Sequence, residues 1–427
     1  MNVLGVNAAS LMYVIRPDHK GHDVGELKYP YLKNIIDRHY LREYKQLDKI
    51  WLEMERESEL LLDHEYLLMI AQKLQDTNSD IEKRLWSERY TEASVSIYGQ
   101  PAANEVACMA WQELQLFKKA YQSYAACRPY LEKSIAVYSK LSSGAVLINS
   151  DLETRYTTLL KQLRKHALMQ FDGAFNCFDG WNLPTMPIEE VKARFATALK
   201  VLACNDDTWA SWDVTWIGGS TLMIDPRMRQ IQIGRRLSEL PTRRVKGLFA
   251  HEVLVHAQRS VNGIRLSPSL SIGLENQICA EEGLGVIMEA AINGQFPYRI
   301  KDRYIDIALA LGMHNVQPMT RQELYDMAYG RALARRLAEN VVVDTELLSD
   351  IIWTHVNRIY KGSLGNDFVG VFTRDIAYYV GFRQMANYIL HRLDWGSTLP
   401  EVMDYLLLGK FDPTNPEHLL HLRQHVR

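Results

Sequence analysis

Apolar residues recur at three- and four-residue steps along much of the chain, which is the pattern of amphipathic helices. The first such run covers residues 31–90, where charged residues separate the apolar ones and neither Gly nor Pro interrupts. IYGQP at 97–101 breaks this pattern. Further helical patterns follow at about 103–140, 150–170 and 188–203. The sequence therefore predicts a helical N-terminal region over residues 1–203.

The pattern changes at residue 204. TWASWDVTWIGG is aromatic and β-prone, and the following STLMIDPRMRQIQIG predicts two short strands around a DPRM turn. After this stretch the pattern becomes helical again, with Pro241 near a first turn, and helices dominate from residue 275. The stretch 171–187 has the composition of an ordered loop. We expect a mainly α fold of the α+β type, in which residues 204–427 form a second region with one small sheet.

Composition and charge limit the kinds of binding partner and the cellular compartment that we expect for this protein. The net charge of −2 predicts no general attraction to nucleic acid or to a membrane surface. Five cysteines, an odd number without any CxxC pair, favour neither a disulfide framework nor a thiolate zinc site. They fit a reducing, cytoplasmic compartment best. No run approaches the roughly 18 apolar residues of a membrane helix. No pattern sets an oligomeric state.

The most informative stretch is HEVLVH at 251–256. In the zinc-peptidase motif HExxH, the two histidines differ by about 40° around a helix and face one ion. His251 and His256 are one residue further apart, which gives about 140° on a regular α-helix. Only a π-type turn would aim both imidazoles at one metal. The spacing predicts either such a distorted helix with a metal site or two unrelated histidines.

Neighbouring residues favour the metal site. The apolar run VKGLFA precedes the motif, as expected for a buried helix that enters an active site. Glu252 directly follows the first histidine, where zinc peptidases place their general base. A second helical pattern, CAEEGLGVIMEA, opens with paired acids at 281 and 282. A carboxylate from this helix would complete a His₂Glu site with an open position for water.

These segments together resemble the HExxxH tyrosine carboxypeptidase family of zinc peptidases. That family includes the microtubule-associated enzymes that remove the C-terminal tyrosine of α-tubulin and bacterial proteins named for a QEGLA motif. The resemblance rests on matches that follow the family's order between about residues 90 and 385: SIYGQP (96–101), HEVLVH with VNG (251–263), EEGLG (281–285), NRIYKG (357–362) and FTRDIAYYVG (372–381). The chain departs from the family pattern where Glu281 replaces Gln, Gly285 replaces Ala and Lys361 replaces Arg. HEVLVH is also more apolar than the HEIGTH of the tubulin enzymes.

The resemblance implies a zincin-like core that binds one Zn²⁺ through His251, His256 and Glu282. It implies Glu252 as the general base and the release of a C-terminal Tyr or Phe from a peptide or protein. Glu281 would then hold a ligand histidine in its tautomer. Glu289, seven residues after Glu282, falls on nearly the same helix face and is a weaker candidate for the same task.

A carboxypeptidase also needs a cation for the terminal carboxylate of its substrate. Arg358 and Arg374 lie in family-like segments, and the fork of an arginine suits a carboxylate; Arg358 is preferred. The alternative for each arginine is an ordinary salt bridge. Tyr378 would donate a hydrogen bond to substrate or serve as a core aromatic. Asp375 would cap a helix.

Other side chains carry weaker signals. Three tryptophans would either line a pocket for an aromatic side chain or belong to the core: Trp209, Trp212 and Trp216. His314 and His355 lie outside the metal motifs, and we interpret them as structural. The strand pair at 220–233 would either offer an edge to an extended peptide or form a small packing sheet.

Two other interpretations remain open at this level. The first is another zinc hydrolase, either an endopeptidase or an amidase. The second is a non-catalytic helical binding protein that keeps a metal for folding. Glu252 argues against the second, because a structural zinc site needs ligands but no base and usually has four protein ligands.

Overall fold

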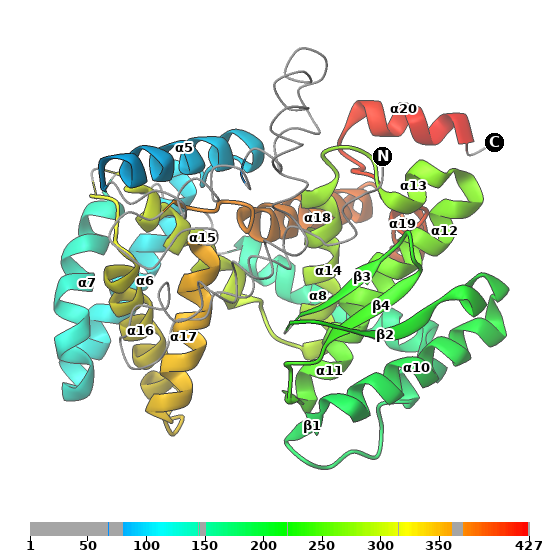
Figure 1. Ribbon diagram of the computed structural model, residues 1–427, viewed down its shortest axis with the longest axis horizontal. Coiled ribbons are helices and arrows are strands. Elements are labelled where there is room, and N and C mark those ends of the chain that lie inside the picture. The colour runs from blue at the N-terminus through cyan, green and yellow to red at the C-terminus, as the bar shows by residue number, and fades with distance from the viewer. Residues whose placement is uncertain are drawn as a thin grey trace. The chain divides into compact units, whose positions relative to one another are not determined.

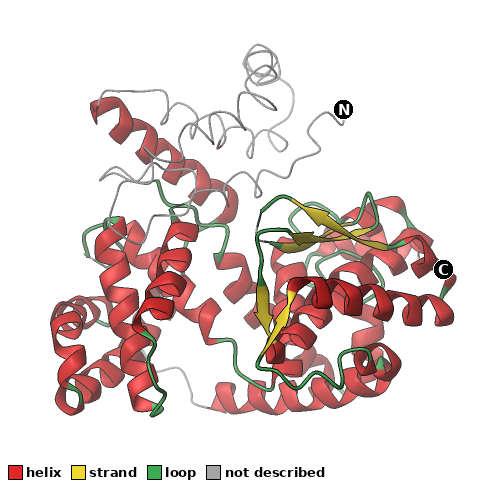
Figure 2. Cartoon of the chain, turned by 60° about the horizontal axis from the view of Figure 1, so that its bottom comes forward, coloured by secondary structure: helices red, strands yellow, loops and turns green. Residues whose placement is uncertain are grey.

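The computed structural model describes residue 67 and residues 80–425, apart from residues 144, 146–150, 220, 315 and 361–369 (Figure 1). The described chain is mainly helical, with two small sheets, which confirms the expected mainly α class (Figure 2). Of the helical run predicted over residues 31–90, residues 80–90 belong to a described helix, and residues 31–66 and 68–79 lie outside the described residues. None of the described helices has the length and apolar character that crossing a membrane requires.

The chain divides into two compact units. Unit 1 contains the described residues of Met1–Ile148 together with Arg299–Ile376, and unit 2 contains Asn149–Tyr298 together with Ala377–Arg427. The boundary expected at residues 203 and 204 does not coincide with this division. It falls inside a single helix of unit 2, α10 (Ile188–Asn205), which packs against the strand that follows it.

Unit 1 consists of helices. They are α5 (Asp80–Tyr98), α6 (Ala103–Ser123), the 3₁₀ turn η1 (Ala125–Cys127), α7 (Arg128–Leu141), nearly all of α15 (Tyr298–Leu311), α16 (Arg321–Ala338) and α17 (Thr345–Ile359). Gly99, with a positive φ of 81°, follows α5 at the predicted break. Glycine accepts this backbone conformation without strain.

The interior of unit 1 holds a buried charge network. Arg331 donates hydrogen bonds to both oxygens of Asp306 and to the hydroxyl of Tyr138. The Nε2 atom of His355 lies 2.7 Å from Asp306 Oδ2. His355 is thus part of the packing of unit 1, and His314 bonds the backbone oxygen of Ala103 at 2.8 Å.

Unit 2 carries the remaining helices around the two sheets. Its helical elements are α8 (Asp151–Gln170), α9 (Asp172–Asn176), α10, η2 (Asp207–Ser211), α11 (Thr242–Phe249), η3 (Ala250–Ala257), α12 (Gln258–Leu266), α13 (Pro268–Ile272), α14 (Ile278–Asn293), nearly all of α18 (Ile376–Asp394), α19 (Leu399–Leu406) and α20 (Pro416–His425). Helix α14 ends at Gly294, which adopts the left-handed conformation common after a helix C-terminus.

The larger sheet has the strand order β2-β4-β3. Strands β3 (Leu222–Asp225) and β4 (Gln230–Gly234) form the predicted antiparallel pair around the DPRM turn, and β2 (Asp213–Ile217) adds to β4 in parallel. Helix α10 packs along β2 (Figure 1). Strand β3 contacts η3. The sheet thus places one edge strand next to the helix that carries HEVLVH.

The smaller sheet was not predicted. Strands β1 (Thr185–Pro187) and β5 (Glu239–Pro241) pair antiparallel. Strand β1 lies in the stretch that we expected to be an ordered loop, which also contains α9. Pro241 ends β5 and directly precedes α11, so the chain enters the metal-motif helix from a fixed strand.

Helices α14 and α18 cross at two glycines. A Cβ atom at Gly381 would lie 1.9 Å from the carbonyl oxygen of Cys279, and one at Gly283 would lie 2.1 Å from the carbonyl carbon of Gly381. Only glycine permits backbones to approach this closely. Gly283 of EEGLG and Gly381 of FTRDIAYYVG therefore allow α14 and α18 to pack this closely.

Candidate metal centre

The HEVLVH segment lies on a π-helix. Helices α11, η3 and α12 form one continuous helical run from 242 to 266, and its central part, Ala250–Ala257, is the π-helix. Val253, Leu254 and Val255 are fully buried in this turn. The wider turn absorbs the surplus residue of the motif, as predicted. The rings of His251 and His256 therefore lie near each other, with centroids 4.7 Å apart.

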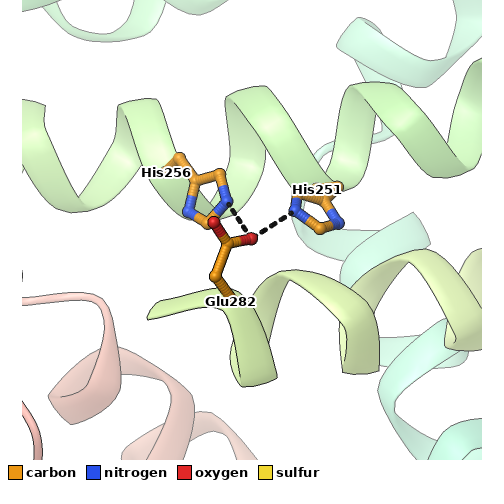
Figure 3. A group of neighbouring side chains, drawn as sticks. All are labelled: His251, His256 and Glu282. Atoms are coloured by element: carbon orange, nitrogen blue, oxygen red, sulfur yellow. Dashed lines mark ion pairs between the residues drawn. The ribbon is translucent and has the colours of Figure 1, made fainter. Parts of the chain in front are cut away.

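Glu282 on α14 completes a convergent group (Figure 3). Its Oε2 atom lies 3.5 Å from Nε2 of His251 and 3.7 Å from Nε2 of His256. Two ligands about 2.1 Å from a tetrahedral metal are roughly 3.4 Å apart, so these separations fit one shared ion. Among the described residues, this is the one group of three or more such side chains with suitable geometry.

A different acid of α14 engages the second nitrogen of each imidazole. Nδ1 of His256 lies 2.8 Å from Glu281 Oε1, and Nδ1 of His251 lies 3.2 Å from Glu289 Oε2. A carboxylate at Nδ1 holds the proton there and leaves Nε2 as the free electron pair for a metal. The structure thus gives Glu281 the predicted contact, and it gives Glu289 an equivalent one.

Electrostatics within the group also suit a cation. Burial would lower the pKa of His251 and of His256, but the neighbouring carboxylates outweigh it and raise both pKa values. Burial would likewise raise the pKa of Glu282, yet the two imidazoles hold it well below the usual range. Protons and a divalent cation would therefore compete for the Nε2 atoms of the two imidazoles.

Glu252 lies between the histidine side chains in sequence but outside the group of three ligand atoms. It is half-buried. Burial raises its pKa above the usual value for a glutamate, against the lowering effect of the imidazoles. A carboxylate with a raised pKa accepts a proton more readily near neutral pH, as a general base must.

Cations support the two orienting acids. Lys410 Nζ lies 2.8 Å from Glu281 Oε1, and the buried guanidinium of Arg259 also bonds Glu281. Arg244 on α11 lies 3.7 Å from Glu289 Oε1. Sequence reasoning missed these three residues. Arg259 carried a signal, since it follows His256 by three residues on nearly the same helix face; Lys410 carried none.

The predicted substrate-binding residues are distributed over both units. Arg358 lies in the last turn of α17 in unit 1, where its guanidinium donates hydrogen bonds to Asp375. Asp375 is buried and also pairs with Arg303 at 3.0 Å, so it joins two arginines. Arg374 is half-buried and lies two residues before α18. Tyr378 is half-buried in the part of α18 that belongs to unit 2.

The tryptophans near the sheet are mostly core residues. Trp209 and Trp212 are buried and pack against each other. Trp216 is half-buried, and the ammonium of Lys192 lies 5.6 Å from its ring centroid. Trp209 also lines a pocket of about 530 Å³ in unit 2, next to Gln258 and Arg265. The described lining of this pocket contains none of the metal-group side chains.

Comparison with known proteins identified no relative of this chain. No protein-family model, no curated protein and no solved structure matches the chain. The function is therefore inferred from the side chains described above and from the motif resemblance of the sequence.

Proposed function

We propose that the protein is a zinc-dependent carboxypeptidase that hydrolyses the last peptide bond of a peptide or protein and releases an aromatic residue. The observation that carries this proposal is the convergence of two imidazole nitrogens from a π-helix, which also carries Glu252, with one carboxylate oxygen from α14. Two histidines and one glutamate are a ligand set of catalytic zinc sites, which keep one position open.

The donor atoms fit a zinc ion in type and spacing. His251, His256 and Glu282 would hold the ion, with Glu289 and Glu281 fixing the two imidazoles from behind. A zinc ion in such a site supplies Lewis acidity toward a carbonyl group and toward water. We propose both that this group binds a metal ion and that the ion is zinc.

Glu252 would move the proton. Its carboxylate takes a proton from the attacking water and passes it to the nitrogen of the leaving amino acid, so that one water is consumed for each bond cleaved. The raised pKa of Glu252, caused first by burial, supports this role. A glutamine in its place could not accept the proton.

Strand β3 offers a path for the substrate backbone. Gly234 N donates to Thr221 O at 2.7 Å, so in this register Leu222 and Ile224 direct their backbone N–H and C=O groups away from β4. No described strand pairs with this outer edge. An extended peptide added there would run beside η3, with affinity that does not depend on its sequence.

Tyr378 remains our candidate for a hydrogen bond to substrate. It lies one turn before Gly381 on nearly the same face of α18, and Gly381 contacts α14 at Gly283, the residue after Glu282. The terminal carboxylate would require a cation, for which Arg358 and Arg374 are proposed from their motif positions. The aromatic preference rests on the resemblance alone.

The proposal is tested with matched peptides that end in tyrosine, either with a free carboxylate or with a C-terminal amide. Zinc-loaded protein should release tyrosine from the free peptide and leave the amide intact, as followed by mass spectrometry. Internal cleavage of both peptides would indicate an endopeptidase instead. Release of ammonia from the amide would indicate an amidase.

A further inference from the structure

Glu281 is the most heavily engaged acid of the metal centre. It is buried, with 6% of its surface exposed. Its Oε1 atom lies 2.8 Å from both His256 Nδ1 and Lys410 Nζ, and Arg259 donates a hydrogen bond to its Oε2. Both cations are themselves buried, with 1% of Arg259 and 5% of Lys410 exposed. A carboxylate held by three partners has one orientation.

Arg259 connects the metal-motif helix to the segment Gly409–Asp412. Besides Glu281, its guanidinium donates to the carbonyl oxygen of Gly409 at 2.7 Å and to that of Phe411 at 2.5 Å. All three nitrogens of the guanidinium are therefore engaged. Arg259 can keep this position only while the segment stays in place.

The segment is in turn anchored to the rest of unit 2. Lys410 N donates to Leu270 O at 2.7 Å, and Lys410 O accepts from Leu274 N at 3.0 Å. Phe411 is fully buried in a cluster with Leu270 and Leu422. These contacts fix the backbone of Lys410, and its side-chain ammonium pairs with Glu281 from this fixed position.

We infer that Lys410 and Arg259 are positioning residues of the metal centre, which act through Glu281 to fix the imidazole of His256. The inference rests on the metal site of the proposed function. It adds a segment of the last 20 residues of the chain, remote in sequence from HEVLVH and EEGLG, to the apparatus that holds the metal. With both Glu281 oxygens occupied by cations, its carboxylate stays at Nδ1, and Nε2 of His256 stays directed at Glu282.

The other histidine is held differently. Glu289, the partner of His251, has 23% of its side chain exposed, and Arg244 lies 3.7 Å from it. Glu281 has 7% of its side chain exposed and two buried cations. We therefore expect substitution of Glu281 or its cations to weaken metal binding more than the equivalent substitution of Glu289 or Arg244.

The experiment is a double-mutant cycle on zinc affinity. Dissociation constants are measured by competition with a chromogenic chelator for wild type, Lys410→Met, Glu281→Gln and the double variant. Lys410→Met should weaken zinc binding by about 10- to 100-fold, the usual effect of removing support for a ligand histidine. In the Glu281→Gln background, the same change should have little further effect, because Lys410 acts through Glu281.

Two further measurements separate positioning from general destabilisation. The visible spectrum of Co²⁺-loaded Lys410→Met should differ from that of the wild type, since the ligand field at His256 changes. Arg335→Met removes a cation from a part-buried ion-pair network in unit 1, where Arg335 pairs with Asp302 at 2.6 Å. This control should lower the melting temperature and leave zinc affinity and the Co²⁺ spectrum unchanged. If Lys410→Met does not fold, Lys410→Gln replaces it with the same expectations.

Unchanged zinc affinity and spectrum in the Lys410 variant would overturn the inference, as would full additivity with Glu281→Gln. Neither result would affect the proposed peptidase, which is tested separately with the tyrosine peptides. Conversely, a wild type that binds zinc but cleaves no peptide would remove the proposed activity and leave this inference standing. A wild type that binds no zinc would overturn both.

Discussion

Gly285 on α14 lies directly beside the imidazole of His251: a Cβ atom at Gly285 would be 2.7 Å from Nε2 of that ring. This contact gives a physical reason for one departure from the QEGLA pattern, in which alanine stands at the same position. The present position of His251 requires glycine there. Because the nearest atom belongs to the end of a side chain, an added methyl group would move the ring while leaving the backbone in place.

We predict that Gly285→Ala lowers zinc affinity by about tenfold, since the displaced ring no longer points at Glu282. The metal-free protein should keep or gain stability, because alanine favours a helix by about 1 kcal/mol over glycine. Gly283→Ala is the contrast, since its methyl group would meet the backbone of Gly381 and lower the melting temperature. Chelator competition and thermal melts decide both points. Wild-type zinc affinity in Gly285→Ala would show that the contact is unimportant.

Glu252→Gln should bind zinc with wild-type stoichiometry and lose hydrolysis by about two to four orders of magnitude, because an amide cannot accept the proton of water. The measurement is the rate of tyrosine release together with metal content. If the variant lost its metal and kept activity, Glu252 would be a ligand, and the roles of the acids would have to be reassigned.

Deleting Leu254 restores the HExxH spacing in the sequence, yet it should abolish zinc binding. The deletion rotates every later residue by about 100°, which moves His256 away from Glu282 and lifts Arg259 from its buried position. Leu254→Ala is the matched control: it costs roughly 2–5 kcal/mol of stability through a cavity but keeps the spacing and the metal. Retained zinc affinity in the deletion variant would contradict the need for a π-helix.

The buried network of unit 1 should make its stability depend on pH. Burial lowers the pKa of His355 below its ordinary value of 6.5, although the hydrogen bond that His355 donates to Asp306 acts in the opposite direction. The unfolded chain then binds the proton more readily than the folded one, so stability falls as pH drops below about 6.5. Asp306 acts at lower pH: burial would raise its pKa, but Arg331 and His355 lower it to about 2. The stability that Asp306 contributes is present above about pH 4 and is lost as pH falls from there toward 2.

His355→Gln isolates the first of these effects, because glutamine can still donate to Asp306 but does not titrate. The urea midpoint of the variant should change less between pH 7 and pH 5 than that of the wild type. If the urea midpoint changed equally with pH in the variant and in the wild type, His355 would have the same pKa in the folded and unfolded states.

Much of the centre was accessible from local patterns. The surplus residue between Glu252 and His256 predicted the π-helix, and the seven-residue step from Glu282 predicted that Glu289 shares its helix face. The DPRM turn between two apolar runs predicted the pairing of β3 with β4. In each case, residues close in sequence determine the geometry.

The remaining features depend on contacts between distant segments. Strands β1 and β5 have three residues each and pair across more than fifty intervening residues, so neither shows a period of its own. Lys410 pairs with Glu281 from a segment whose Phe411 is buried against Leu270, far away in the sequence. Arg358 was proposed for substrate from its motif, with an ordinary salt bridge as the alternative, but no local pattern identified Asp375 as its partner. Such pairings arise from packing, which local periodicity does not encode.

We propose that His251, His256 and Glu282 together bind one zinc ion. Anomalous diffraction from zinc-soaked crystals, recorded on both sides of the zinc absorption edge, tests it most directly. We predict one strong peak that disappears below the edge and lies about 2.0–2.2 Å from Nε2 of both histidines and from a Glu282 carboxylate oxygen. A map with no peak among these three side chains would contradict the account, and the proposed enzyme would fall with it.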